Sequence, residues 1–148
     1  MPTAPVSDLV DLVEEATDAY IKGEVRRYFS LFGHPAECSL MPPYGGETTD
    51  NLRHDDEAMA ATSAFFTSGA GHFDLQHQIA SGDLVVLAGI ERQHGEVGGL
   101  PDQDWSLRVT LVFRRSGDGW ELLHRHADPL VRPIPFEHCA QLARGLDA

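Results

Sequence analysis

The feature that most limits the fold of this chain is a change of hydrophobic period near its middle. Before residues 69–71 (Gly-Ala-Gly), apolar residues recur at the spacing of a helix with one buried face. After them, apolar and polar residues alternate, which is typical of a half-buried strand. The helical set includes Leu9, Leu12, Val13, Ala16 and Tyr20, and the alternating set is Phe73, Leu75, His77 and Ile79. A helical half followed by a strand half predicts an α+β fold.

The spacing predicts helices over residues 7–23, 25–32 and 55–68, with Ser7 capping the first and the glycines of 69–71 ending the third. Strands are expected over 72–79, 84–94, 105–115 and 120–128, joined as an antiparallel meander. Pro133 and Pro135 precede a short C-terminal helix. We therefore expect one domain over 1–148 with 133–148 as a C-terminal helical extension, and a curved antiparallel sheet that buries one face against the helices.

The turn at residues 116–119 allows the register of the last two strands to be predicted. If it pairs Arg115 with Trp120, then Phe113 faces Leu122, Leu111 faces His124, and Val109 faces His126. These residues form the more apolar face, so His124 and His126 are expected to project into the core. His77 shares a similarly apolar face with Phe73, Leu75 and Ile79. A slip of one residue would reverse every one of these assignments.

Charge and composition exclude several classes of function. The 148 residues carry 11 Lys and Arg against 23 Asp and Glu, a net charge of −12, which argues against nucleic-acid and anionic-membrane partners. No apolar run is close to the length of a membrane span, which is about 18 residues. The acidic N-terminus is also unlike a signal peptide. A cytoplasmic location is therefore expected. Cys38 and Cys139 are too few for a disulfide scaffold. Gly98-Gly99 is followed by neither a helix nor a lysine, so it is not expected to bind phosphate. No cofactor is predicted.

Several local sequences together resemble the NTF2-like superfamily over about residues 8–130. They are Gly23-Glu24 after the first helix, Arg108-Val109-Thr110, the Gly119-Trp120 turn, and His124-Arg125-His126. Within the superfamily, the chain is most similar to SnoaL-like proteins and to the association domain of calmodulin-dependent kinase II. The resemblance implies a cone-shaped sheet of the cystatin-like α+β roll type, with a pocket at its open end, and a homodimer formed through the outer sheet face. The superfamily includes isomerases, cyclases, hydrolases, dehydratases and assembly modules, so the fold leaves the function open.

The resemblance also argues against three activities of the superfamily. Ketosteroid isomerisation needs a carboxylate base, a tyrosine and a protonated acid, and the matching positions hold Ala16, Met41-Pro42 and Val109-Thr110. Epoxide hydrolysis of the limonene type needs an arginine in the cavity, whereas the predicted register places Arg108 on the outer face. No carboxylate for a SnoaL-type cyclisation can be placed on the core face of the last two strands.

A histidine-bearing pocket is what remains. His124 and His126 are candidate acid–base groups, because imidazole titrates near neutral pH. Together with His77 they also have the composition of a zinc site, although no metal is assigned. The alternative is that all three are buried structural histidines. The other histidines are expected at the surface: His34, His54, His72, His94 and His138.

We therefore expect a domain that holds a small, mainly apolar organic molecule, with Tyr20, Tyr44, His77 and Trp105 as substrate-binding residues. If it is an enzyme, His126 and His124 would catalyse acid–base isomerisation, cyclisation or hydrolysis. The alternative is a non-enzymatic module for ligand binding, dimerisation or assembly with a vestigial pocket. Its expected partners are the small molecule and a second copy of the chain.

Overall fold

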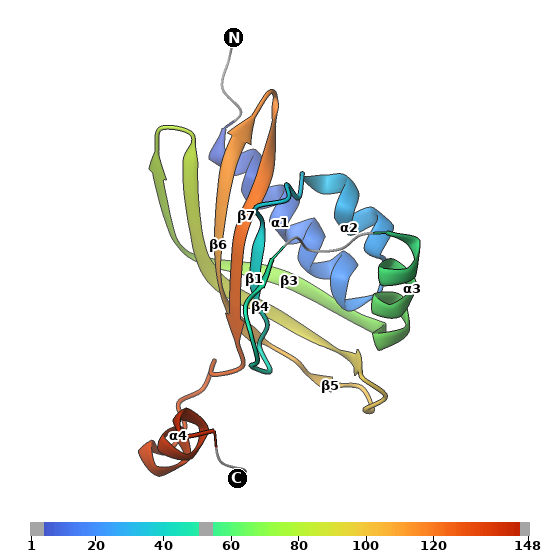
Figure 1. The fold of residues 1–148 in the computed structure, drawn as a ribbon, viewed down its shortest axis with the longest axis vertical. Coiled ribbons are helices and arrows are strands. Elements are labelled where there is room, and N and C mark those ends of the chain that lie inside the picture. The colour runs from blue at the N-terminus through green and yellow to red at the C-terminus, as the bar shows by residue number, and fades with distance from the viewer. Residues whose placement is uncertain (1–4, 51–54, 146–148) are drawn as a thin grey trace.

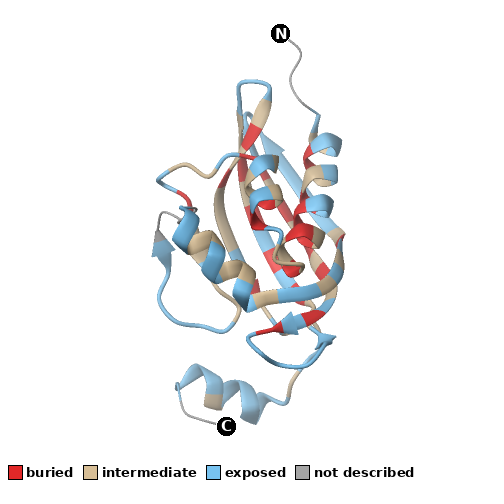
Figure 2. Cartoon of the chain, turned by 90° about the vertical axis from the view of Figure 1, so that its right-hand side faces the viewer, coloured by how far each residue is buried: buried red, intermediate tan, exposed pale blue. Residues whose placement is uncertain are grey.

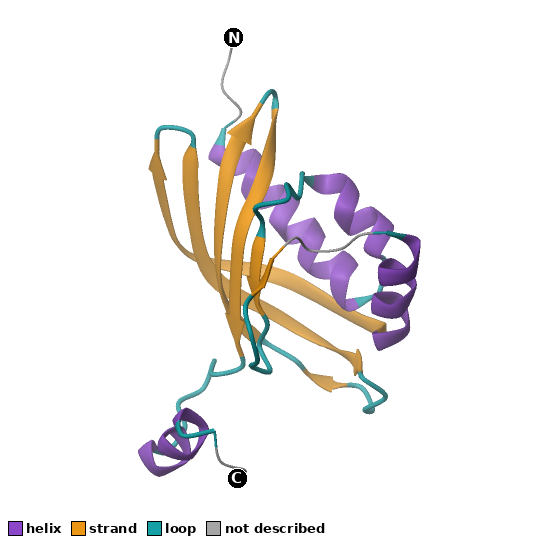
Figure 3. Ribbon diagram, viewed as in Figure 1, coloured by secondary structure: helices purple, strands orange, loops and turns teal. Residues whose placement is uncertain are grey.

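Helices fill most of the first half of the chain and strands most of the second half, as the change of period predicts (Figure 3). The structure is a computed structural model that describes residues 5–50 and 55–145. Its helices are α1 (Val6–Ile21), α2 (Val25–Leu31), α3 (Asp56–Phe65) and α4 (Phe136–Ala143). Its strands are β1 (Ser39–Met41), β2 (Thr49–Asp50), β3 (Phe66–Ser81), β4 (Leu84–Val97), β5 (Gln103–Asp104), β6 (Leu107–Ser116) and β7 (Gly119–Asp128).

The strands form one curved sheet in the order β2-β1-β7-β6-β4-β3, with β5 paired to β4. The predicted meander of β3, β4, β6 and β7 is confirmed, and each neighbouring pair is antiparallel. The sheet is nevertheless mixed, because β1 pairs with β7 in parallel. The short strands β1, β2 and β5 were not predicted, since two or three residues are too few to show a period. The sheet bends around α1 and α2, which lie on its concave side (Figure 1).

The glycines at 69–71 do not end the third helix as predicted. Helix α3 stops at Phe65, and the glycines lie inside β3. A Cβ atom on Gly69 would lie 2.3 Å from the carbonyl oxygen of His94, and one on Gly71 would lie 3.2 Å from Thr17 Cγ2 in α1. The glycines therefore let β3 approach its neighbours closely. The predicted cap by Ser7 is also wrong, because Pro5 occupies the N-cap position and makes no side-chain cap bond.

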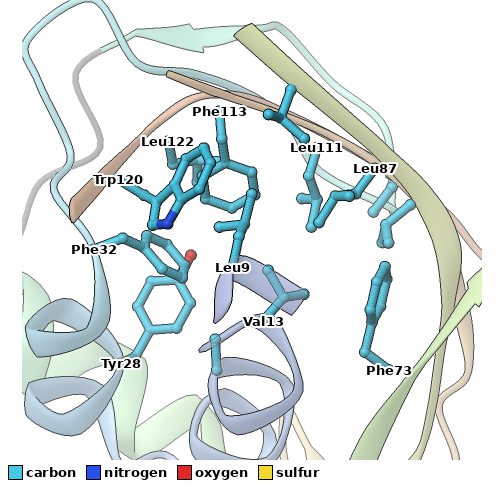
Figure 4. Packing of buried hydrophobic residues seen from close by; sticks show 14 of the residues in the cluster. Leu9, Val13, Tyr28, Phe32, Phe73, Leu87, Leu111, Phe113, Trp120 and Leu122 are labelled. Carbon is cyan, nitrogen blue, oxygen red and sulfur yellow. The ribbon is translucent and has the colours of Figure 1, made fainter. Parts of the chain in front are cut away.

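The core lies between α1 and the concave face of the sheet (Figures 2 and 4). Helix α1 contributes Leu9 and Val13, which are nearly inaccessible to solvent. Alternate residues of β6 point toward them, and this inward set is Leu107, Val109, Leu111 and Phe113. The alternation confirms the face that the sequence predicts for β6.

The predicted register of β6 and β7 holds only up to Phe113 and Leu122. A β-bulge follows, because Val112 pairs with His124 and leaves Leu123 as an extra residue. Beyond the bulge every side chain of β7 changes face relative to the prediction. His124 and His126 lie beside Val112 and Thr110 on the convex side of the sheet, so their predicted projection into the core is wrong.

A second bulge changes the face of His77. The register of β3 against β4 shifts between Leu75 and His77, so Gln76 is the extra residue. Phe73 is buried before the bulge, whereas His77 pairs with Ala88 on the convex side and is exposed. Ile79 follows it outward and is 64% exposed. The expected apolar face of this strand therefore ends at Leu75.

The other histidines follow the sequence prediction in part. His72, His94 and His138 are exposed, as expected, and His54 lies outside the described residues. His34 is the exception, because it is half-buried and its ring lies 4.7 Å from the centroid of Phe29.

None of the helices in the described ranges is long and apolar enough to cross a membrane.

Replacing Phe113 by alanine should destabilise the fold by about 3–5 kcal/mol, because the deletion leaves a cavity at a fully buried position. Urea unfolding followed by tryptophan fluorescence would measure the change. Thr110→Ala, on the exposed face of the same strand, should cost no more than about 0.5 kcal/mol. Equal effects of the two substitutions would contradict the assignment of the two faces of β6.

Candidate functional site

A cavity of about 80 Å³ lies between α1, α2 and the concave face of the sheet, and we call it the central pocket. Most of the side chains around it are apolar. Its lining is Val13, Ala16, Thr17, Tyr20, Ile21, Tyr28, Phe32, Leu40, Pro42, Pro43, Tyr44, Phe66, Glu91, Gln93, Trp105, Leu107, Leu111, Phe113, Leu122 and Arg125. A few polar groups in a mostly apolar concavity are the usual composition of a small-molecule site.

An ion pair between Glu91 of β4 and Arg125 of β7 is the main polar feature of the central pocket. Arg125 Nη1 donates to Glu91 Oε2 at 2.6 Å, and Nη2 donates to Oε1 at 2.7 Å. The two side chains are only 8% and 20% exposed. Such a bidentate pair fixes the orientation of both groups.

The register of the sheet explains why two charges lie on its apolar side. Glu91 continues the inward series of Val85 and Leu87 in β4. Arg125 pairs with Leu111 across β6 and β7, and it points inward because the bulge at Leu123 has shifted the register. The sequence signal for Glu91 is a single carboxylate in an otherwise apolar alternation. Arg125 had no such signal, since the unbulged register assigns it to the outer face.

The guanidinium of Arg125 keeps donors available for a ligand. Burial by itself would lower the pKa of Arg125, but the adjacent Glu91 carboxylate and its hydrogen bonds raise that pKa above the ordinary value. The group therefore stays charged. A guanidinium has more N–H donors than the two bonds to Glu91 use, and within residues 5–50 and 55–145 no further acceptor bonds them.

Two phenols from the helices lie beside this ion pair. The ring of Tyr20 meets that of Tyr28 edge-on, with centroids 4.9 Å apart, and Figure 4 shows Tyr28 extending from α2 into the space beside α1. Burial raises the pKa of both tyrosines, although the charge of Arg125 acts in the opposite direction. Both phenols are therefore protonated near neutral pH and can donate hydrogen bonds. Neither hydroxyl has a hydrogen-bond partner in the described part of the chain.

Two further aromatic residues, Tyr44 and Trp105, line other parts of the central pocket. Tyr44 follows Pro42 and Pro43 after β1 and is 72% exposed. Trp105 is half-buried, and its backbone is fixed to Gln93, since Gln93 Nε2 donates to the Trp105 carbonyl at 3.0 Å and Trp105 N donates to the Gln93 carbonyl at 2.9 Å. The exposure of Tyr44 indicates that the pocket opens beside it.

The structure brings together half of the residues that the sequence predicts for the site. Tyr20, Tyr44 and Trp105 line the central pocket, whereas His77, His124 and His126 contribute nothing to its lining. The predicted acid–base role of His124 and His126 depended on their lying in the pocket, and the structure does not place them there. His124 instead connects two strands, because its Nδ1 lies 2.7 Å from Ser39 Oγ of β1.

A metal site built from the three histidines is not supported. In the residues that the structure describes, no three His, Cys, Asp or Glu side chains are grouped as metal ligands would be. What the central pocket offers chemically is a set of hydrogen-bond donors in apolar surroundings, namely Tyr20, Tyr28 and Arg125. Such donors are chemically complementary to an acceptor oxygen.

Replacing Arg125 by methionine should destabilise the fold by about 3–5 kcal/mol, because Glu91 would be left buried without its partner. The double variant R125M/E91L should recover most of this loss, since it removes both charges. Chemical unfolding of the wild type, both single variants and the double variant would measure the coupling. Additive effects of the two substitutions would show that the pair contributes no coupling energy.

Residues 9–131 match the family model of the SnoaL-like domain. An NTF2-like protein of unknown function from Shewanella oneidensis MR-1 is 18% identical, with a TM-score of 0.63 over 84% of this chain and 98% of the other. The calmodulin-dependent kinase II hub homology domain of Chlamydomonas reinhardtii is 16% identical, with a TM-score of 0.64 over 83% and 96% of the two chains.

A third solved structure, described as a candidate dehydratase of the NTF2-like family from Streptomyces avermitilis, is 24% identical, with a TM-score of 0.59 over 86% of this chain and all (100%) of the other. No protein with a curated description matches. Identities this low support the fold alone, but the family model covers most of the chain. The chain belongs to the SnoaL-like domain family, and its fold is that of NTF2-like proteins.

Proposed function

We propose that this protein binds a small, mainly apolar molecule in the central pocket, through one acceptor oxygen of that molecule. The observation that carries the proposal is the charged Arg125 guanidinium, which is held by Glu91 and still has N–H donors available beside two unpaired phenols. Burying such donors without an acceptor costs free energy. A carbonyl or carboxylate oxygen would satisfy them.

The size of the central pocket limits the ligand. A cavity of about 80 Å³ is well below the roughly 300–1,000 Å³ of sites for drug-sized ligands. It suits a ligand with one small ring or a short branched chain. Val13, Leu107 and Leu111 would surround the apolar part of such a molecule, whereas its oxygen would face Arg125 and Tyr20.

Binding without catalysis agrees better with the lining than acid–base chemistry does. In the described part of the chain, Glu91 is the lone carboxylate of the lining, and both of its oxygens accept bonds from Arg125. A general base must reach the proton that it removes, and this carboxylate is already engaged. The description of the Streptomyces avermitilis structure as a candidate dehydratase therefore does not transfer readily to this pocket.

Three cyclic probes of similar size would test the binding proposal: cyclopentanone, cyclopentanecarboxylate and cyclopentane, titrated by nuclear magnetic resonance. The two probes with an oxygen should bind about tenfold more tightly than cyclopentane, since hydrogen bonds of this kind contribute about 1.4 kcal/mol. Tyr20→Phe should remove most of this advantage for cyclopentanone. His126→Ala, outside the pocket, should leave all three affinities unchanged.

Equal affinities for cyclopentane and cyclopentanone would argue against recognition of an acceptor oxygen. A loss of probe affinity in His126→Ala would indicate that the probes bind at the histidines and not in the central pocket. Failure of all three probes to bind at millimolar concentration would remove the central pocket as a ligand site.

We also propose that two copies of the chain pair through the convex side of the sheet, which we call the outer sheet face. Its apolar centre consists of Ile79, Val86, Ala88, Ile90 and Val112, from β3, β4 and β6. Exposed apolar patches of this kind mark interaction surfaces. A structural relative from Chlamydomonas reinhardtii is described as a hub homology domain, which agrees with pairing here.

The charges around this apolar centre favour a second copy as the partner. A chain with a net charge of −12 repels itself, but the rim of the outer sheet face is balanced by internal ion pairs. These are Arg92 with Asp74, Arg108 with Asp128, and Arg114 with both Glu37 and Glu121, so that three arginines offset most of the charge of four carboxylates. Self-association through this face therefore avoids the like-charge contact that most of the surface would produce.

Val112→Glu should convert the protein to a single chain in solution, because it places a carboxylate at the apolar centre of the outer sheet face. Light scattering after size exclusion would measure the mass, and circular dichroism would verify the fold. Ala61→Glu, at an exposed position of α3, is the matched control and should leave the mass unchanged. An unchanged mass for Val112→Glu would place any interface elsewhere.

A further inference from the structure

Helix α4 has an apolar face that its own chain leaves uncovered. The helix lies beyond the end of β7, on the side of the sheet away from α1 and α2 (Figure 1). No residue of α4 is buried, and Phe136, on this face, is 89% exposed. In the described part of the chain, no helix or strand makes an extensive contact with it.

The sequence of α4 requires a partner. Its apolar residues recur at helical spacing on one face, and they are Phe136, Cys139, Ala140 and Ala143. Eight residues are fewer than the about 12–15 that an isolated helix needs to be stable in water. Its N-cap, Pro135, makes no side-chain cap bond. The helix therefore depends on packing that residues 5–50 and 55–145 do not supply.

The segment that leads to α4 directs it away from its own core. Asp128, the last residue of β7, accepts two hydrogen bonds from Arg108, at 2.8 and 3.0 Å, and another from the backbone N–H of Leu130 at 2.9 Å. This fixes the start of the segment at the edge of the outer sheet face. Pro129, Pro133 and Pro135 then stiffen the chain between β7 and α4. Folding back onto the concave side would require a reversal of this direction.

We propose that α4 is an exchanged arm, which packs its apolar face on a second copy of the chain seated at the outer sheet face. The inference rests on the proposed pairing through that face. The arm would extend that interface beyond the outward positions of the four strands, because α4 adds an exposed apolar surface next to them. Phe136 alone would contribute a large apolar surface.

Charge favours the same partner. Residues 129–148 contain Arg132 and Arg144 against Glu137 and Asp147, so the arm is neutral and the net charge of −12 belongs to the rest of the chain. A neutral arm can approach a second acidic copy without the repulsion that the remaining surface would impose.

Sedimentation equilibrium of the full chain would test the arm. Phe136→Ser should weaken the dimer by at least about tenfold, because a large apolar side chain would be lost from the interface. His138→Ser is the matched control on the polar face of α4 and should change the dissociation constant by less than about twofold.

Mixed dimers would locate the arm directly. One copy would carry a spin label on a cysteine introduced by H138C in a C139S background, and the other would be labelled with nitrogen-15. The arm model predicts that signals of the outer sheet face broaden in the copy without the spin label. Broadening confined to the spin-labelled chain would overturn it.

The outcomes separate the arm from the pairing on which it rests. A dimeric wild type that becomes monomeric with Val112→Glu but is unaffected by Phe136→Ser would overturn the arm and keep the outer-face interface. A wild type that stays monomeric at high concentration would overturn both. Loss of affinity in Phe136→Ser together with intermolecular broadening would support the arm.

Discussion

The curvature of the sheet is the constraint on which both faces of this protein depend. A sheet that wraps around α1 cannot keep a regular ladder along its long strands, and β-bulges provide the necessary bends. Here the bulges fall at Thr67 and Gln76 in β3 and at Leu123 in β7. Each inserts one residue and reverses the faces of the side chains that follow. The bulge at Leu123 thereby turns Arg125 toward the helices and two histidines away from them.

The ion pair in the central pocket follows from that reversal. Two charges on an apolar face would normally be unfavourable, since their desolvation offsets their attraction. The bidentate geometry of Glu91 and Arg125 limits this cost, and it leaves the other N–H groups of the guanidinium directed at no protein acceptor in the described chain. A buried pair that is weak as a source of stability is therefore useful as a rigid donor group for a ligand.

The two sides of the sheet are suited to different tasks. The concave side holds a small apolar pocket with donors, whereas the outer sheet face has an apolar centre and a rim of balanced ion pairs. His124 and His126, placed on the outer side, belong to the second surface and not to the first. The proposed ligand binding and the proposed self-association can therefore be tested independently by substitutions on opposite sides of the same strands.

The sequence by itself determined the elements that have a strong local period: α1, α2, the strands of the meander, and the inward face of β6. It also indicated Tyr20, Tyr44 and Trp105, which line the central pocket. It could not reveal β1, because three residues show no period and their partner, β7, lies far along the chain. Nor could it reveal which face Arg125 and His126 occupy. Alternation is a local property of the sequence. The position of a bulge depends on how the whole sheet bends, and only the tertiary structure decides where that bend falls.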